Sequence, residues 1–180
     1  MSKTRLILAA LLLASPMHAA LAQSTVIHAG MLWDGSGSAM QENMTIVVTD
    51  GLIESVSSGF VAPGAEDELV DLSDQTVLPG LIDLHVHIEG ETSPNRTAAR
   101  FTKNPEDIAF DSAMYARRTL MAGFTTIREL GGTGVNIALR DAINQGRAEG
   151  PRIITVGKSL ATTGGHADPT NGWRDDLMGA

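Results

Sequence analysis

The chain has 180 residues, of which 43% are hydrophobic and 19% are charged. This composition is typical of a globular protein and excludes a fully disordered chain or a coiled coil. The 13 basic and 21 acidic residues give a net charge of −8, so the chain lacks the basic footprint of a nucleic-acid-binding protein. No cysteine is present. Disulfides and a lipoprotein anchor are therefore excluded, and a metal site has to use His, Asp, Glu or a modified Lys.

Residues 1–22 have the three-part pattern of a secretory signal peptide. Lys3 and Arg5 precede the apolar segment LILAALLLASPMHAALA, whose final ALA places small residues at positions −3 and −1 of a cleavage site. The apolar run is shorter than a membrane span of roughly 20 residues, and a proline and a histidine interrupt it. We therefore expect cleavage after Ala22, a secreted or periplasmic protein without membrane attachment, and a mature net charge of −10, because two basic residues and no acidic one are removed.

Residues 23–75 are expected to form a small β-sheet unit of three or four strands. β-Branched residues flank Asp50-Gly51, which is the strongest hairpin signal in the chain. The stretch VIHAGMLW indicates a short strand pair ahead of the turn-forming DGSGS, and one further short strand is expected over residues 68–72. So few strands cannot form a large core alone.

From residue 76 the pattern changes to alternating strands and helices. Asn104 can cap the first helix, Pro105 suits its first position, and Gly123 can end it. Short connections between alternating elements imply an α/β fold with a parallel sheet. The strands are expected at residues 76–88, 124–130 and 151–157, and the helices at 104–123 and 135–146.

Asp83, His85 and His87 share one face of the strand VLPGLIDLHVHI, because residues two apart in a strand point to the same side. The intervening apolar residues can pack under helices, so the polar row faces the other side of the sheet, which is the interior in a closed barrel. Ionisable groups there are costly without partners, and neutral imidazoles are good zinc ligands. We predict that His85 and His87 bind a divalent metal. The alternative is a half-exposed strand with two histidines by chance; their place at the C-terminal side of the strand favours the metal site.

The segment LPGLIDLHVH resembles the first barrel strand of the amidohydrolase superfamily. The β unit with DGLIESV resembles that superfamily's small sandwich domain. GFTTIRELGG and GPRIITVGKSLATTGGHADP are similar to the second and third strands of the imidazolonepropionase-like branch, which includes prolidase-like dipeptidases, carboxypeptidases and amidases of the ochratoxin-amidase type. The resemblance covers residues 24–180. It implies the first three βα units of a metal-dependent TIM (β/α)8 barrel at residues 76–180, preceded by the N-terminal part of a β-sandwich at residues 23–75.

The resemblance also implies one or two metal ions, usually zinc, that lower the pKa of a bound water so that hydroxide can attack a carbonyl. His85 and His87 would bind the more buried ion. In the family a carboxylated lysine, two more histidines and a proton-shuttling aspartate follow strands four to eight, so we expect a truncated chain whose catalytic residues lie beyond residue 180. Lys158 follows the third strand instead of the fourth, and is interpreted as an ordinary loop lysine.

Other polar residues near the strand ends have two interpretations each. His166, in TTGGHADP, is expected to orient the substrate carboxylate or carbonyl; the alternative is a loop histidine bonded to its own backbone or to Asp168. Glu129 would support a metal-bound histidine or form an internal salt bridge. Asp83 is expected in a structural or histidine-supporting role. Trp173 would line a substrate pocket or be loose near the chain end.

We therefore expect a metal-dependent hydrolase of C–N bonds, which in the full-length protein cleaves a peptide or amide bond next to an amino acid carboxylate. Its expected partner is a small peptide or N-acyl amino acid, with no nucleic acid and no membrane after cleavage; formation of a homo-oligomer stays open. A deaminase or cyclic-amide hydrolase of the same superfamily is one alternative, and an inactive truncated fragment is another.

Overall fold

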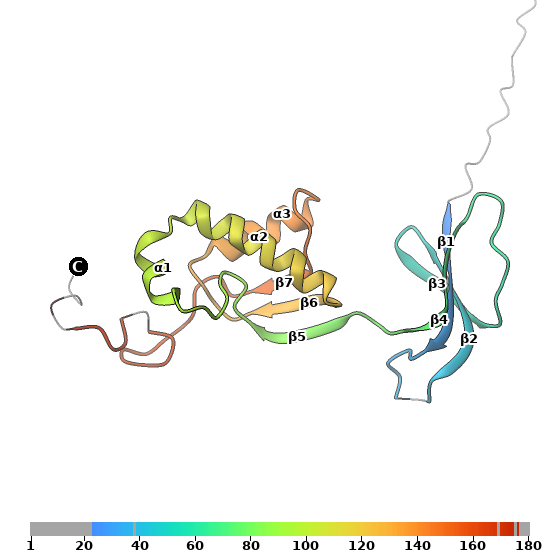
Figure 1. The fold of residues 1–180 in the computed structure, drawn as a ribbon, viewed down its shortest axis with the longest axis horizontal. Helices are drawn as coiled ribbons and strands as arrows, with labels where there is room; N and C mark the ends of the chain where they lie inside the picture. Colours follow the sequence, from blue (N-terminus) through green and yellow to red (C-terminus); the bar gives the residue numbers. More distant parts are fainter. Residues whose placement is uncertain (1–22, 38, 169, 175, 177–180) are drawn as a thin grey trace, which may run out of the picture. The chain divides into compact units, whose positions relative to one another are not determined.

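The computed structural model describes residues 23–37, 39–168, 170–174 and 176, and it divides the chain into two compact units, Met1–Leu78 and Pro79–Ala180 (Figure 1). The expected signal peptide at residues 1–22 lies outside the described residues. Within the described part, no helix combines the length and the apolar character needed to cross a membrane.

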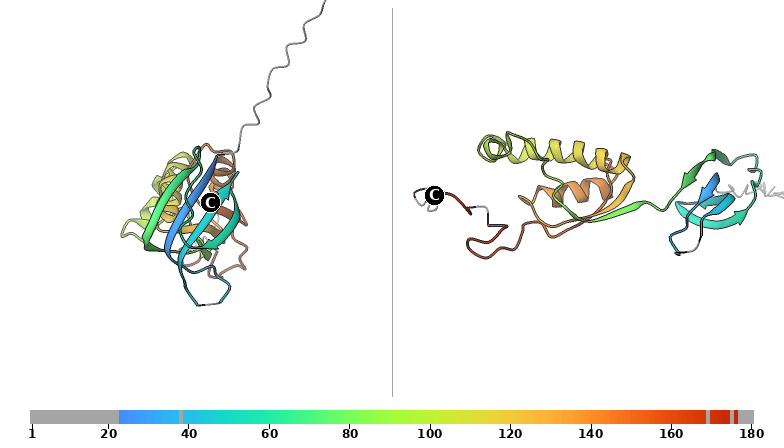
Figure 2. Two further views of the ribbon diagram at one scale, coloured as in Figure 1. Left: turned by 90° about the vertical axis from the view of Figure 1, so that its right-hand side faces the viewer. Right: turned by 60° about the horizontal axis from the view of Figure 1, so that its bottom comes forward.

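The first unit is a four-stranded sheet in the order β3-β2-β1-β4 (Figure 2). β1 pairs antiparallel with β2 and parallel with β4, and β2 pairs antiparallel with β3. Residues 26–32 of the stretch VIHAGMLW therefore lie in one strand with a partner on each side, and the expectation of a strand pair within the stretch is wrong. The strands are β1 Ser24–Leu32, β2 Gln41–Thr49, β3 Leu52–Ser58 and β4 Glu68–Val77.

The hairpin expected at Asp50-Gly51 is confirmed. The two residues have φ angles of 52° and 75°, and they connect β2 to β3 with Thr49 opposite Leu52. Two consecutive left-handed residues in a two-residue loop are the signature of a type I′ turn, whose twist matches that of the strands.

β4 is longer than the expected strand over residues 68–72, because its pairing with β1 continues as far as Leu32 opposite Val77. Val77 also packs against the core of this unit, which consists of Ala29, Leu32, Met44 and Ile46. Thr76 and Val77, which the sequence analysis assigned to the start of the next strand, thus belong to the first sheet. The units divide after Leu78, three residues later than the boundary at residue 75 expected from the sequence.

The second unit contains a parallel sheet in the order β5-β6-β7. The predicted α/β class with parallel strands is confirmed, and the alternation of strands and helices follows the predicted order. One helix, α1, was not expected, since its seven residues show no apolar periodicity. The elements are β5 Leu81–Val86, α1 Arg96–Thr102, α2 Pro105–Met121, β6 Phe124–Glu129, α3 Val135–Asn144 and β7 Arg152–Thr155.

α2 and α3 cover the same face of this sheet (Figures 1 and 2). α2 starts where the sequence predicted, with Pro105 in its first turn and a reciprocal capping box between Asn104 and Asp107. The buried core between the sheet and these helices contains Ile88, Ala116, Ile127, Leu139 and Ile153. The carboxyl ends of the three strands therefore lie at one edge, where parallel α/β sheets carry their sites.

Candidate metal and substrate site

His85 lies in β5 and His87 directly follows that strand. Their rings are 5.4 Å apart between centroids and nearly perpendicular, at 76°, and both residues are exposed. Val86, between them, and Ile88 pack in the core under the helices. The two imidazoles thus lie side by side on the face of the sheet opposite to α2 and α3, as the alternation of the strand predicts.

One hydrogen bond of His87 shows that its Nδ1 carries a proton. Its Nδ1 lies 2.9 Å from the carbonyl oxygen of Gly131. Because a carbonyl can only accept, Nδ1 carries the proton and donates it. The other nitrogen, Nε2, then has a free lone pair in the neutral ring, which is the arrangement found in metal-binding histidines whose second nitrogen donates to a carbonyl or carboxylate.

Glu129 lies behind His87 at the end of β6 and is fully buried. Its carboxylate accepts hydrogen bonds from the backbone N–H groups of Ile88 and, at 2.8 Å, of Gly131. Its Oε1 is 3.4 Å from His87 Nδ1. Burial raises the pKa of Glu129, while the two backbone hydrogen bonds and the neighbouring His87 act in the opposite direction. The neighbouring Arg128 is exposed.

Asp83 does not contact the histidine rings through a hydrogen bond. Its Oδ1 accepts a 3.0 Å hydrogen bond from the backbone N–H of His85. Asp83 therefore contacts the backbone of the strand next to His85 and supports the imidazoles only indirectly.

The donor set fits a divalent ion in part. His85 and His87 present two adjacent imidazoles, and neutral imidazole nitrogens are good zinc ligands. No group of three or more His, Cys, Asp or Glu side chains that could hold an ion occurs in the described ranges. Since zinc takes four ligands in most protein sites, these two histidines fit as two of them, and the others have to come from elsewhere.

A cavity of about 710 Å³ opens beside His87 and also takes in His166 and Trp173. Two of the residues predicted for the site, His87 and His166, therefore border one space. His85, Asp83 and Glu129 do not line it. The volume lies in the range of small-molecule sites. Its other walls come from residues 89–92, from α1 and Lys103, from Ile108 and Tyr115 of α2, from residues 131–133, from Ser159 and from residues 167–168.

His166 is exposed, and no hydrogen bond joins it to another described residue. The alternative contact with Asp168 does not form. Asp168 instead accepts hydrogen bonds from the backbone N–H groups of Gly164, at 2.7 Å, and Thr170, at 2.9 Å. These bonds lower the pKa of Asp168. The imidazole of His166 thus remains available to a ligand in the cavity.

Two residues that tie the strand ends together were not expected. The carboxylate of Glu89 accepts hydrogen bonds from the backbone N–H (2.8 Å) and side-chain amide (2.6 Å) of Asn136, in the first turn of α3. Asn136 is fully buried; it also donates to the carbonyl of Gly157 at 2.9 Å and accepts from the hydroxyl of Thr155 at 2.7 Å. The position of Glu89, two residues after His87, is the one sequence signal that could have indicated this link.

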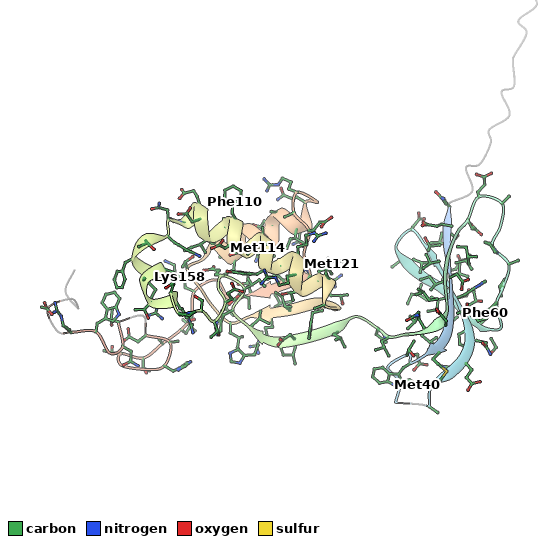
Figure 3. The ribbon with its side chains drawn as sticks, in the orientation of Figure 1. Met40, Phe60, Phe110, Met114, Met121 and Lys158 are labelled. Carbon is green, nitrogen blue, oxygen red and sulfur yellow. The ribbon has the colours of Figure 1, made fainter. Side chains whose placement is uncertain are left out.

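Lys158 is exposed (Figure 3). Its backbone forms isolated β-bridges with Gly132 and Thr133. This placement matches its interpretation as a loop residue. Basic side chains line the cavity elsewhere, on α1, which carries Arg96 and Arg100, and at Lys103, which follows it.

Comparisons with known proteins identify the family. The model of the amidohydrolase family matches residues 76–177. Ochratoxinase from Aspergillus niger is 30% identical over 150 residues, which are 82% of this chain and 31% of that protein. Its crystal structure matches with a TM-score of 0.66 at 29% identity, over 82% of this chain and 34% of that one.

A crystal structure of a Xaa-Pro dipeptidase with methionine bound in the active site is 44% identical, with a TM-score of 0.79, over 86% of this chain and 38% of that one. A dihydroorotase from Trichlorobacter lovleyi is 36% identical over 63 residues, which are 35% of this chain and 14% of that protein. The chain thus spans about two fifths or less of the length of these relatives. On the match over residues 76–177, the chain belongs to the amidohydrolase family.

Proposed function

We propose that this chain is part of a metal-dependent hydrolase that cleaves a peptide or amide C–N bond next to an amino acid carboxylate. The observation that carries the proposal is the environment of His87. Its Nδ1 donates to the carbonyl of Gly131, so that Nε2 is free to bind an ion. His87 also lies beside His85 and borders a cavity that His166 lines as well. The similarity to a dipeptidase and to ochratoxinase supports amides of amino acids as the substrate class.

The fold proposed for the whole protein is a (β/α)8 barrel accompanied by a small β-sandwich. The parallel strands β5, β6 and β7 would be the first three barrel strands, with His85 and His87 on the interior face and the cavity at the carboxyl ends. The four-stranded sheet of the first unit would be the N-terminal part of the sandwich. The three-part pattern of residues 1–22 supports an exported, secreted or periplasmic protein.

Within this chain each site residue would have one task. His85 and His87 would hold the divalent ion, zinc in this proposal, and Glu129 and Gly131 would keep the His87 ring in its binding orientation. When bound, the ion would lower the pKa of a water and polarise the scissile carbonyl. His166 would orient the carbonyl or carboxylate of the substrate from its place in the cavity lining. A carboxylated lysine, two further histidines and an aspartate that moves the proton would come from the rest of the family's fold.

A cyclic-amide hydrolase is the second candidate. It is favoured by the dihydroorotase similarity, which extends over a shorter stretch than the similarity to ochratoxinase. The two candidates share the two histidines and differ in substrate. An open dipeptide or N-acyl amino acid would be cleaved by the first enzyme, and a cyclic amide by the second.

The test uses the protein expressed from its complete reading frame. Zinc content is measured by elemental analysis, and hydrolysis is followed on dipeptides, N-acyl amino acids and dihydroorotate. We expect bound zinc and cleavage of the open substrates. In His85→Ala and His87→Ala, zinc content and kcat/KM should fall, the latter by more than about 100-fold, since loss of residues that merely support a ligand already costs roughly 10–100-fold.

His28→Ala is the matched control, because His28 lies on β1 in the first unit and bonds to the carbonyl of Val61. This variant should keep its metal and its activity. A wild-type protein without metal and without hydrolysis of any substrate in the panel would contradict the proposal, and selective cleavage of dihydroorotate would favour the second candidate.

A further inference from the structure

The cavity beside His87 carries positive charge on one wall. Arg96, Arg100 and Lys103 are spaced at intervals of four and three residues along α1 and its C-terminal cap. Side chains at this spacing lie on the same face of a helix. All three residues line the cavity. This face of α1 therefore contributes cationic side chains to the same cavity that His87 and His166 border.

The acidic residues that line the same cavity have other partners. Glu89 accepts hydrogen bonds from Asn136 at the start of α3. Glu91 pairs with Arg118 at 3.1 Å, and Asp168 is held by the backbone of its own loop. None of these carboxylates neutralises the wall formed by α1.

Within the described part of the chain, Lys103 is the one of the three cations with an anionic partner, because its ammonium group pairs with Asp111. Arg96 and Arg100 form no ion pair and no side-chain hydrogen bond with any described residue. Two guanidinium groups one helical turn apart are thus left unpaired at a concave surface, in a chain whose net charge is −8. Such a pair attracts anions locally, and guanidinium groups bind carboxylates with two parallel hydrogen bonds.

Helix α1 contacts the segment after β7, which also carries His166. The ring of Phe101, on α1, lies 5.8 Å from the ring of Trp173, which also lines the cavity. This ring contact lies between α1 and the segment after β7, so the arginine face and His166 border the same cavity.

We propose that Arg96 and Arg100 bind the two carboxylates of a dicarboxylic amino acid, so that the amide cleaved is one formed by the amino group of an aspartate- or glutamate-type residue. This inference rests on the proposed function and specifies its substrate class. Two carboxylates on one small molecule are separated by two or three carbon atoms, which suits two arginines one turn apart better than a single carboxylate does.

The kinetic test compares alanyl-glutamate with alanyl-glutamine on the metal-loaded protein from the complete reading frame. The two dipeptides have nearly the same shape and differ by one charge. We expect kcat/KM to be about 10-fold or more higher for alanyl-glutamate, as one charge-assisted hydrogen bond implies, with the difference mainly in KM. In the double variant Arg96→Gln, Arg100→Gln, the ratio should fall toward 1.

Arg147→Gln is the matched control, because Arg147 is exposed and does not line the cavity. It should keep the wild-type ratio. Equal rates for both dipeptides in the wild type, or a preference for alanyl-glutamate that survives in the double variant, would overturn the inference while leaving the proposed function in place.

A binding measurement separates the two hypotheses. Glutarate, a dicarboxylate without an amide bond, is titrated calorimetrically into the metal-loaded wild type and the double variant. Binding that depends on Arg96 and Arg100 and weakens with added salt supports the dicarboxylate site, even if no dipeptide is hydrolysed and the proposed function fails. Equal binding to both proteins, or binding to neither, contradicts the dicarboxylate site.

Discussion

At the scale of single residues, the site depends on how the end of β6 holds the end of β5. The carbonyl of Gly131 accepts from His87, and the N–H of Gly131 donates to Glu129, so one glycine backbone links the imidazole to the buried carboxylate. Of these two links, only the one between the N–H of Gly131 and the carboxylate needs Glu129 as an acceptor. The contribution of this carboxylate to stability can therefore be tested by a substitution that removes one of its acceptor oxygens.

Glu129→Gln should destabilise the protein. Both carboxylate oxygens accept from backbone N–H groups, those of Ile88 and Gly131, and a glutamine amide has one oxygen to replace two. One buried N–H is left without an acceptor, which costs about 1–3 kcal/mol. Urea unfolding of the wild type and the variant measures the difference.

The matched control is Glu149→Gln. Glu149 pairs with Arg117 at 2.9 Å, but its side chain is 73% exposed, and exposed ion pairs contribute at most about 1 kcal/mol. Equal effects of the two substitutions would show that the carboxylate of Glu129 is not needed by the two backbone donors.

At the scale of elements, local sequence signals account for the structure where they act over a few neighbouring residues. The Asp50-Gly51 turn and the capped start of α2 at Asn104-Pro105 both form where they were expected. In each case one residue suits the local backbone: glycine tolerates a positive φ, and proline fixes φ and lacks an N–H donor. These elements should respond strongly to substitutions that remove that property.

Gly51→Ala should weaken the β2–β3 hairpin. Gly51 has a φ of +75°, and no atom lies within 4 Å of an added Cβ, so the effect would be one of backbone strain alone, about 1–2 kcal/mol. Gly90→Ala is the matched control, since Gly90 also has open space around it but no positive φ. Thermal unfolding should show a lower Tm for the first variant only; a similar Tm for both would mean that the turn does not require a left-handed residue.

Elements and site residues that depend on distant partners could be predicted less well. β4 continues to Val77 because β1 pairs with it, which no local signal shows. The face and spacing of His85 and His87 followed from strand alternation, and the contact between Glu129 and His87 from their places at adjacent strand ends. Asn136, Arg96 and Arg100 were missed, because their importance arises from the cavity wall and the α3 terminus, which form only when the chain is folded.

At the scale of the whole molecule, the second unit leaves much apolar surface exposed. On the edge strand β5, Ile82 and Leu84 are 60% and 64% exposed. At the other edge, Ile154 in β7 and Val156 directly after it are 56% and 54% exposed. Phe110, on α2, is 80% exposed (Figure 3). In the proposed barrel, β5 and β7 would each pair with a further strand, and Ile154 and Val156 would be covered. Without such partners, unpaired strand edges next to apolar side chains favour association.

The 180-residue chain expressed alone should therefore bind the dye ANS and associate as its concentration rises, as measured by fluorescence and light scattering. The double variant Ile154→Thr, Val156→Thr should reduce both signals, since threonine keeps the β-branched shape that suits a strand while removing apolar surface. Leu160→Thr is the control: Leu160 is 98% exposed but lies in the loop after β7, away from a strand edge, so it should change little. A chain that stays monomeric at high concentration and does not bind the dye would contradict this expectation. It would show that the edges of β5 and β7 do not need further strands to cover their apolar side chains.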